Sequence, residues 1–367
     1  MKKPLVAILA GPLDDQNAGI HVYTREMIRS FLKNKTCNYV LVRQKHTDIF
    51  SDLIKEIIVP SYRFIGLKTI RLFFMIPFRL LKINPDIVIE PAHFGPFNLP
   101  KRIKRVTIIH DLTPIIYPHW HRYYSQLLQR CFLNNILKHA SLILTNSENT
   151  LRDLNNYFPF TTDKSIMIYP GVDPYYCIPD NDITIKKEPF LLFTGTIEPR
   201  KNLITLLEAY QKFREQSHFK PKLVITGGKG WKSKSFYNTL KKHPYRQDID
   251  LRGYVSKEEL RLLYRTTSAF IFPSFYEGFG FPVAEAMSCG ACCIISKTSS
   301  LTEIGGDSVI YFDANDSEEL AKKIIQVLTD QKIVENLIQK GRIQAAKFRW
   351  DEFALKFENE LVKLASS

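Results

Sequence analysis

Short runs of apolar residues alternate with longer amphipathic segments along this chain of 367 residues. In the first half, seven apolar runs are typical of buried parallel strands; they lie at 5–10, 39–42, 56–59, 86–90, 105–111, 141–145 and 165–169. Segments of helical length lie between several of them, at 19–34, 64–82, 120–139 and 147–157. This βαβ alternation predicts a parallel sheet with helices on both faces.

The alternation pauses over the proline-rich and polar residues 170–189 and then starts again. The second series has six predicted strands (190–195, 222–228, 248–255, 269–274, 292–296, 308–313) and predicted helices at 203–217, 257–266, 282–289 and 317–330. We therefore expect a Rossmann-like domain at 1–176, a linker at 177–188, a second Rossmann-like domain at 189–349 and a C-terminal helix at 350–367, with packing on the first domain as one option. Because open α/β sheets bind ligands at the carboxyl ends of their strands, the active site is expected in a cleft between the domains.

The composition is that of a soluble globular protein, with 45% hydrophobic and 24% charged residues. The apolar run near the N-terminus is too short for a signal peptide, and no stretch approaches the length of a membrane span, so a cytoplasmic location is expected. The six cysteines do not form a zinc-binding pattern. We expect Cys289, Cys292 and Cys293 to act as small apolar residues.

The net charge of +14 is compatible with nucleic acid, an anionic membrane or a phosphorylated substrate. Segment 61–82 interleaves basic with aromatic and aliphatic residues, so it could lie along the inner face of the plasma membrane. The alternative is a packed helix that is kinked or ends near Pro77. Nucleic-acid binding has no zinc-finger or RNP-like sequence to support it.

The stretch FPSFYEGFGFPVAEAMSCG, residues 272–290, carries the strongest chemical pattern. Gly278-Phe279-Gly280 follows a predicted strand, and Pro282 suits the first position of a helix, so the turn is expected to favour an anion. The third glycine of a dinucleotide fingerprint is missing, and no G-x-x-x-x-G-K-[ST] loop is present.

Two acids, Glu277 and Glu285, flank this turn, and carboxylates accept hydrogen bonds from the paired hydroxyls of sugars. The pattern favours a nucleotide sugar, with its diphosphate at the turn and one sugar ring held by each acid. An acid that merely stabilises a helix start is the alternative for Glu285.

The spacing of seven residues between Glu277 and Glu285, followed by AMSCG, resembles the signature of family 4 retaining glycosyltransferases of the GT-B fold, and of bacterial mannosyltransferases among them. Further similar pieces are 18–23, His110-Asp111, TNSENT (145–150), YPGVD (169–173), GTIEPRKN (195–202), TGGKGW (226–231) and GYV (253–255). The resemblance covers nearly the whole chain. It implies an α/β protein of two doubly wound Rossmann-like domains that face each other across a cleft.

The resemblance also implies roles for single residues. Glu285 would bind the ribose hydroxyls and Glu277 the transferred sugar, with the amides of Gly278, Phe279 and Gly280 near the diphosphate. Arg200 and Lys201 would neutralise the departing diphosphate, and Lys229 would lie near the nucleotide.

In the first domain, the resemblance implies that Gly19 lets the backbone approach the ligand and that His110 lies near the reacting sugar. The sequence departs from the family at Thr196, where many relatives carry arginine, and at Ala18, where they carry glycine. Ordinary structural roles remain alternatives for Lys201, Lys229 and His110.

The expected activity is transfer of a hexosyl unit, with mannose favoured, from a nucleoside-diphosphate sugar to a hydroxyl of a glycan or lipid-linked acceptor in envelope polysaccharide synthesis. GDP-mannose is the preferred donor, UDP-hexoses and deoxysugar donors stay open, and neither a metal nor another cofactor is expected. A GT-B nucleotide-sugar epimerase and a basic nucleic-acid-binding protein are the alternative functions.

Overall fold

The computed structural model describes residues 3–15, 19–46, 50, 52–60, 70–93, 95–96, 98–178 and 187–366. It divides the chain into two compact units. Unit 1 comprises Met1–Ile115, Tyr124–Gly171 and Arg349–Ser367, and unit 2 comprises Ile116–Tyr123 and Val172–Phe348. The short segment 116–123 therefore belongs to unit 2, although its neighbours on both sides in the sequence belong to unit 1.

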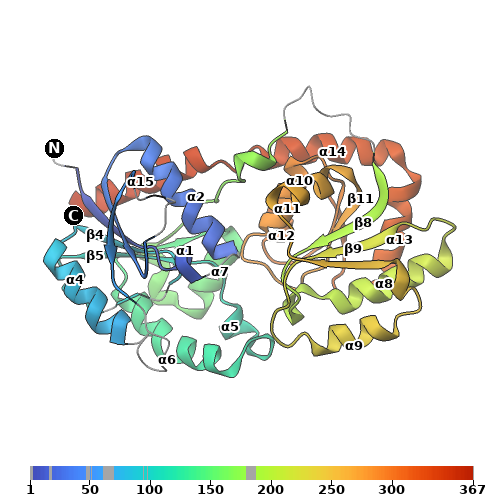
Figure 1. The fold of residues 1–367 in the computed structure, drawn as a ribbon. Coiled ribbons are helices and arrows are strands. Elements are labelled where there is room, and N and C mark those ends of the chain that lie inside the picture. The colour runs from blue at the N-terminus through green and yellow to red at the C-terminus, as the bar shows by residue number, and fades with distance from the viewer. Residues whose placement is uncertain are drawn as a thin grey trace. The chain divides into compact units, whose positions relative to one another are not determined.

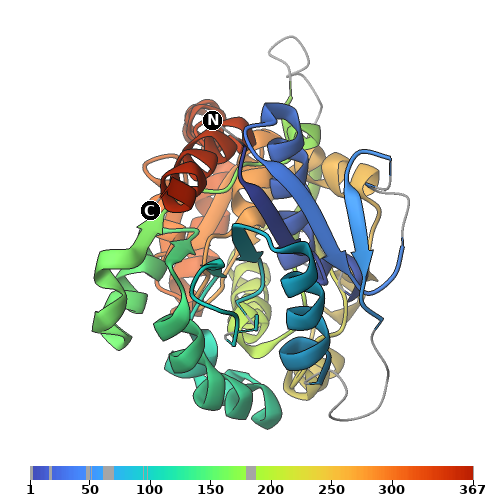
Figure 2. The ribbon, with the colours of Figure 1, turned by 90° about the vertical axis from the view of Figure 1, so that its left-hand side faces the viewer.

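Unit 1 is built on a seven-stranded sheet with the strand order β3-β2-β1-β4-β5-β6-β7. All its strand pairs are parallel, and β1 and β2 lie side by side in Figure 2. The strands are β1 Leu5–Leu9, β2 Asn38–Arg43, β3 Lys55–Ile58, β4 Ile87–Glu90, β5 Lys104–Ile109, β6 Leu142–Thr145 and β7 Ser165–Met167.

Helices cover both faces of this sheet, with α2 and α15 on one face and α4 and α6 on the other (Figure 1). The helices are α1 Pro12–Asp15, α2 Gly19–Asn34, α4 Ile76–Ile83, α5 Thr113–Ile116, α6 Tyr123–His139, α7 Glu148–Tyr157 and α15 Trp350–Ser366. A π-helical segment, η1 Arg71–Met75, precedes α4, and the 3₁₀ segment η3 Pro159–Lys164 precedes β7. The C-terminal helix α15 packs against α2, so unit 1 contains both ends of the chain.

Unit 2 has a six-stranded parallel sheet with the order β10-β9-β8-β11-β12-β13. Its strands are β8 Glu188–Thr194, β9 Lys222–Thr226, β10 Ile249–Gly253, β11 Thr267–Phe272, β12 Cys293–Ser296 and β13 Ile310–Phe312. The strand order reverses between β8 and β11, and such a reversal is where doubly wound sheets bind their ligands.

The helices of unit 2 also lie on both faces of their sheet, with α8 and α9 on one face and α10, α11 and α14 on the other (Figure 1). They are α8 Leu203–Gln216, α9 Lys234–Lys242, α10 Lys257–Thr266, α11 Phe281–Ser288, α12 Leu301–Gly305, α13 Ser317–Thr329 and α14 Gln331–Ala345. The described residues of the unit also form the 3₁₀ segments η2 Pro118–Trp120, η4 Pro174–Tyr176, η6 Pro199–Lys201 and η7 Arg246–Asp248.

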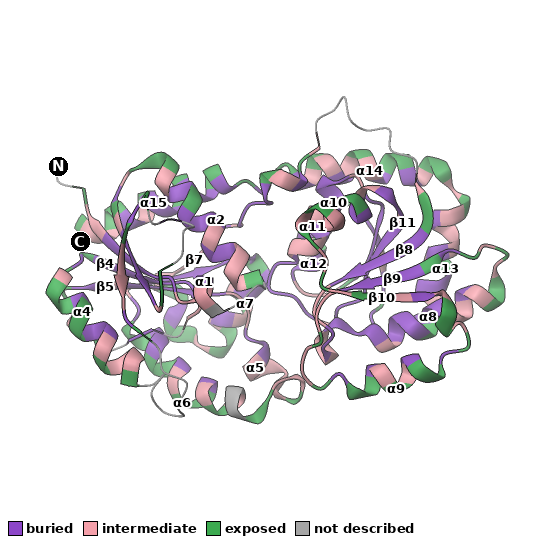
Figure 3. Ribbon diagram, viewed as in Figure 1, coloured by how far each residue is buried: buried purple, intermediate pink, exposed green. Residues whose placement is uncertain are grey.

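The structure confirms every predicted strand, because each of the thirteen apolar runs overlaps a strand of one of the two sheets. These strands are largely buried (Figure 3), as expected where helices cover both faces. Residues 61–69 of segment 61–82 and residues 179–186 of the expected linker lie outside the described residues. Helices α9 and α14 were not predicted.

Two smaller expectations concern residues 282–293. Pro282 occupies the second position of α11 rather than the first, because the helix begins at Phe281. Cys289, Cys292 and Cys293 are buried and unpaired, as expected for small apolar residues, and burial raises the pKa of the Cys292 thiol to about 12.

No helix of the described chain is both long and apolar enough to cross a bilayer.

Candidate active site

The segments that follow β8 and β11 meet at the strand-order reversal of unit 2. The segment after β8 carries Arg200 and Lys201 in the short turn η6, and the segment after β11 carries Glu277. The two strands are direct neighbours in the sheet, so their carboxyl ends place these side chains together.

Asn202 ends the turn η6 and fixes the path of the chain that follows it. Its backbone is left-handed, with φ of 55°, a conformation that asparagine tolerates better than most residues. Its buried side-chain amide donates to the carbonyl oxygens of Pro273, at 3.0 Å, and Ala314, at 2.7 Å. The end of η6 is thus joined to the segments after β11 and β13, which holds Lys201 in place.

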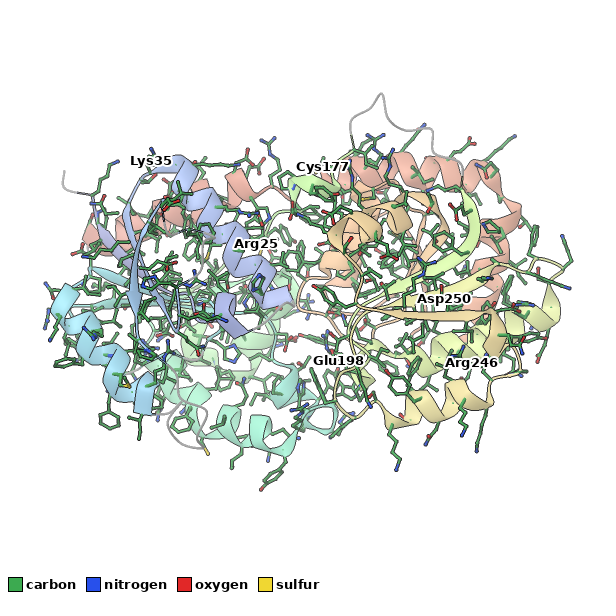
Figure 4. All side chains as sticks on the ribbon, in the orientation of Figure 1. Arg25, Lys35, Cys177, Glu198, Arg246 and Asp250 are labelled. Atoms are coloured by element: carbon green, nitrogen blue, oxygen red, sulfur yellow. The ribbon has the colours of Figure 1, made fainter. Side chains whose placement is uncertain are left out.

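Glu277 accepts from both cations. Lys201 Nζ lies 2.6 Å from Glu277 Oε1, and Arg200 Nη1 lies 2.5 Å from Glu277 Oε2. The other terminal nitrogen of Arg200 lies 2.8 Å from Oε1 of Glu198, a residue that follows β8 (Figure 4). Lys201 Nζ also lies 4.6 Å from the centroid of the Phe272 ring, so this ammonium group is buried between an acid and an aromatic face.

Burial and charge act in opposite directions on these groups. Burial alone would raise the pKa of the Glu277 carboxyl, but the charges of Arg200 and Lys201 outweigh it and lower that pKa to about 2. Burial lowers the pKa of the Lys201 ammonium, and the charge of Glu277 opposes this effect. Burial raises the pKa of Glu198. Glu277 is therefore a carboxylate at neutral pH, oriented by the buried Lys201 and the half-buried Arg200.

Ser299 and Ser300, which follow β12, hold the loop from Glu277 to Gly280. The amide of Glu277 donates to Ser299 Oγ at 2.9 Å, and Ser300 Oγ lies 2.9 Å from the carbonyl oxygens of both Glu277 and Phe279. Gly280 caps α11 with φ of 104°, a conformation that a side chain would strain. A Cβ there would also lie 2.9 Å from Leu301 Cδ2. The turn therefore requires glycine at this position.

Glu285 lies in the second turn of α11 in a different environment. Tyr264 Oη donates to its Oε2 at 3.3 Å. Burial, followed by the negative charge of Asp173, raises the pKa of the Glu285 carboxyl to about 8. The two predicted acids thus differ in protonation at neutral pH, since Glu277 is ionised and Glu285 is mostly protonated.

Lys229 lies at the same edge of the sheet, in the segment after β9. Its backbone forms a bridge with Ile197, its side chain is exposed, and its Nζ lies 5.4 Å from the centroid of the Tyr237 ring. An exposed lysine beside an aromatic ring is able to meet a ligand from solvent.

Two of the predicted site residues, His110 and Gly19, belong to unit 1. His110 directly follows β5, and its Nε2 donates to the carbonyl oxygen of Pro91 at 2.7 Å. Its ring packs edge-on against Tyr23 with centroids 4.7 Å apart, and burial lowers the pKa of its imidazole. His110 is therefore neutral at pH 7, with the proton on Nε2 and Nδ1 as acceptor.

Gly19 is exposed and begins α2. Among the described residues, no atom lies within 4 Å of the position that a Cβ would take there, so packing inside the protein does not require glycine. This observation fits a position that a ligand approaches.

Sequence reasoning did not single out four groups that shape these sites. Glu198 pairs with Arg200, Ser299 and Ser300 hold the 277–280 loop, and His93 accepts from Gln129 Nε2 at 2.6 Å in unit 1. Burial lowers the pKa of His93 to about 4. Glu198 could have been found, because it lies inside the GTIEPRKN segment, whereas the serines carry no local signal. Within the described parts of the chain, no three His, Cys, Asp or Glu side chains form a group that could hold a metal ion.

The fold and this site define a glycosyltransferase of the GT-B fold. Residues 18–176 match the family described as "Glycosyltransferase Family 4", and residues 180–344 match "Glycosyl transferases group 1". The chain is 32% identical to the "O-antigen chain mannosyltransferase B" of Escherichia coli over 71% of either chain. It therefore belongs to this family of glycosyltransferases.

Two solved structures show the same fold at low sequence identity. The sucrose-phosphate synthase of Thermosynechococcus elongatus is 17% identical, with a TM-score of 0.80 over the full length of both chains. The Anabaena protein Alr3699/HepE, solved in complex with UDP-glucose, is 15% identical, with a TM-score of 0.77 over 98% of this chain and 100% of its own.

Proposed function

We propose that this glycosyltransferase moves a hexosyl unit, preferably mannose, from a nucleoside-diphosphate sugar to a hydroxyl of a glycan or lipid-linked acceptor, with retention of the anomeric configuration. The cluster of Glu277, Arg200 and Lys201 at the strand-order reversal of unit 2 carries this proposal. The buried Lys201 and the half-buried Arg200, beside a glycine turn and a helix start, suit a diphosphate, which is a dianion.

Lys201 is able to contact a ligand as well as Glu277, because an ammonium group has three N–H donors. The guanidinium of Arg200 adds a second positive charge beside it. Glu277 holds both cations in position and keeps lone pairs for sugar hydroxyls. Glu285, in α11, would accept from the ribose hydroxyls.

The names of the relatives support the choice of donor and product. The Escherichia coli relative is an O-antigen chain mannosyltransferase, which supports mannose and an envelope polysaccharide. The Anabaena neighbour binds UDP-glucose, which supports a nucleotide sugar as donor. GDP-mannose is our preferred donor on these grounds, and no metal ion is assigned a step.

The cation cluster suggests how the anomeric configuration is retained. Both oxygens of Glu277 accept from cations, which makes this carboxylate a weak nucleophile for a double displacement. In a front-face route, the departing phosphate oxygen takes the proton of the acceptor hydroxyl, while Lys201 and Arg200 stabilise the charge that develops on the diphosphate. His110, neutral and with Nδ1 as acceptor, would hold a hydroxyl of the transferred sugar.

We also propose that the described part of segment 61–82 lies at an anionic membrane surface. Four apolar residues are exposed and recur at helical spacing, beginning at the N-cap of η1 and continuing through η1 and α4. They are Ile70, Phe74, Phe78 and Leu81, with exposed fractions of 47%, 69%, 57% and 43%. Lys82 Nζ lies over the Phe78 ring at 4.4 Å, so basic and apolar groups share this surface. Such a combination is typical of helices that lie in a membrane interface.

A thermal-shift panel of nucleoside diphosphates tests the donor, followed by transfer from the matching nucleotide mannose to a mannoside acceptor. We expect GDP to raise the melting temperature most and GDP-mannose to yield an α-linked product. Hydrolysis or epimerisation of the donor at the same rate with and without acceptor would contradict the proposal.

A further inference from the structure

A cavity of about 580 Å³ lies in unit 2 beside the carboxyl ends of β11, β12 and β13. All of its lining residues belong to that unit, and none of them is a predicted site residue. Its volume falls within the range of small-molecule sites, roughly 300–1,000 Å³.

Aromatic rings form one wall of this cavity. Trp120 stacks on Phe275 with centroids 5.8 Å apart and an angle of 11°, and Tyr117 stacks on Trp120 at 4.3 Å. All three rings are half-buried, so each keeps ring surface that a ligand can cover.

The segment that supplies two of these rings is anchored within unit 2. Trp231 Nε1 donates to the carbonyl oxygen of Trp120 at 2.6 Å, and Lys232 Nζ donates to that of His119 at 2.5 Å. These bonds fix residues 116–123 to the segment after β9. Hydrogen bonds within unit 2 therefore hold the aromatic wall in place.

Polar groups line the other side. Asp313 Oδ1 accepts from the backbone and side-chain amides of Asn315, at 2.8 and 3.2 Å, and Glu319 Oε2 accepts from the Asp313 amide at 2.8 Å. Lys297 and Asp313 are exposed at the rim. One cation and two carboxylates give this lining a net charge of −1, which disfavours a diphosphate and suits an uncharged ligand with hydroxyl groups.

We propose that the cavity binds a short stretch of uncharged glycan, as a subsite for the acceptor or product chain. A hexose ring has an apolar face of C–H groups that packs on an aromatic ring and an edge of hydroxyls that donates to carboxylates and amides. This inference rests on the proposed function, since it names the acceptor of the same transfer.

The subsite adjoins the cation cluster through the chain itself. Phe275 of the aromatic wall precedes Glu277 by two residues, and its amide donates to the carbonyl oxygen of Arg200 at 2.9 Å. A glycan held against Phe275 therefore lies at the edge of the sheet where the transfer is proposed.

Titration of the full-length protein with α-linked mannobiose and mannotriose tests the subsite, read by tryptophan fluorescence and by saturation-transfer NMR of the sugar. Two variants are compared with the parent protein. The first, Trp120→Ala, removes a ring of the aromatic wall but also loosens segment 116–123, so a second variant is needed. The second, Asp313→Ala with Asn315→Ala, changes only exposed rim residues. We expect millimolar binding of mannotriose, tighter than that of mannobiose, and at least a tenfold loss of affinity in both variants.

The control variant is Asp307→Ala, an exposed aspartate of unit 2 outside the cavity, which should bind mannotriose like the parent protein. Thermal shifts with GDP run in parallel on all four proteins and should be equal. Absence of mannotriose binding, or equal binding in all variants, overturns the subsite while an intact GDP shift leaves the proposed transferase standing. Loss of the GDP shift in the rim variant would assign the cavity to the donor and also overturn the proposal.

Discussion

Lys201 is the residue whose charge is least replaceable. Its ammonium group is buried against Glu277 and Phe272. If this group were removed, water could not supply the same stabilisation of negative charge at this buried position. A cation in such a site stabilises developing negative charge more strongly than one in water, because it is already oriented.

We predict that Lys201→Ala lowers kcat by about 10²–10³, the cost of removing one oriented donor from an anionic transition state. Lys201→Arg should not restore activity, because the planar guanidinium does not fit the site of a compact ammonium. Single-turnover rates with saturating donor measure the effect. The matched control is Lys241→Ala, an exposed lysine of α9; a rate for Lys201→Ala as high as for this control would refute the assignment.

Glu285 gives a prediction about pH. Its pKa of about 8 means that it is mostly protonated at pH 7, whereas hydrogen bonds from both ribose hydroxyls need the carboxylate. The affinity for the intact nucleotide sugar should therefore rise about tenfold per unit between pH 6 and 7 and level off above pH 8. Calorimetry measures this, and a nucleotide sugar is used because it lacks a terminal phosphate that titrates near pH 6.

Glu285→Gln is the control for that profile, since the amide cannot ionise. The variant should bind the nucleotide sugar more weakly at pH 8, and its affinity should not change with pH. An affinity of the variant that still rises with pH would show that another group controls binding.

The raised pKa of Glu285 also has a consequence for folding. Between the unfolded pKa near 4.5 and the folded pKa of about 8, the folded state binds more protons, so this residue makes unfolding easier as pH rises.

At the scale of elements, the strands were predictable because burial on both faces leaves a continuous apolar run. Helix α9 was missed because nine residues with two buried apolar side chains, Phe236 and Leu240, show too little periodicity. In α14, Gly341 interrupts the pattern; a Cβ there would meet Met287 at ordinary van der Waals distances of 3.4–3.8 Å, so packing does not require glycine.

The site was only partly predictable. The motifs identified Glu277, Arg200 and Lys201, but Glu277 and Lys201 are 76 residues apart and their pairing depends on adjacent strands. The sequence also carries no sign that residues 116–123 join unit 2, because that assignment depends on contacts such as Trp120 with Phe275.

The exposed apolar residues of η1 and α4 lead to a prediction about membrane binding. We expect the protein to bind vesicles that contain anionic lipid and to bind neutral ones weakly. Phe74→Ser with Phe78→Ser should weaken binding at least tenfold, because inserting one phenylalanine side chain contributes up to roughly 1.5–3 kcal/mol. Flotation with labelled vesicles measures it, with Phe160→Ser, an exposed phenylalanine elsewhere in unit 1, as control. Equal flotation with neutral and anionic vesicles would contradict the proposal.

For the whole molecule, the return of the chain to unit 1 has energetic consequences. Helix α15 buries Phe353, Phe357 and Leu361 in unit 1, and Tyr39 Oη donates to Glu358 at 2.5 Å. The last residues of the chain are thus needed for the core of the first unit, while unit 2 keeps a separate core around β8 and β11.

We predict that Phe357→Ala destabilises unit 1 by about 3–5 kcal/mol, the usual cost of emptying a buried phenylalanine site, and leaves unit 2 nearly unchanged. Phe357 is fully buried and packs on Phe31 with centroids 5.5 Å apart, whereas Leu355 on the same helix is 59% exposed, so Leu355→Ala is the matched control. Urea unfolding followed by hydrogen exchange separates the two units, since a nucleoside diphosphate should protect unit 2 alone. Because each unit has its own sheet and core, protection in β8 and β11 should persist at urea concentrations where the variant has lost it in β1 and β2. Simultaneous loss in both sheets would show that the two cores unfold as one.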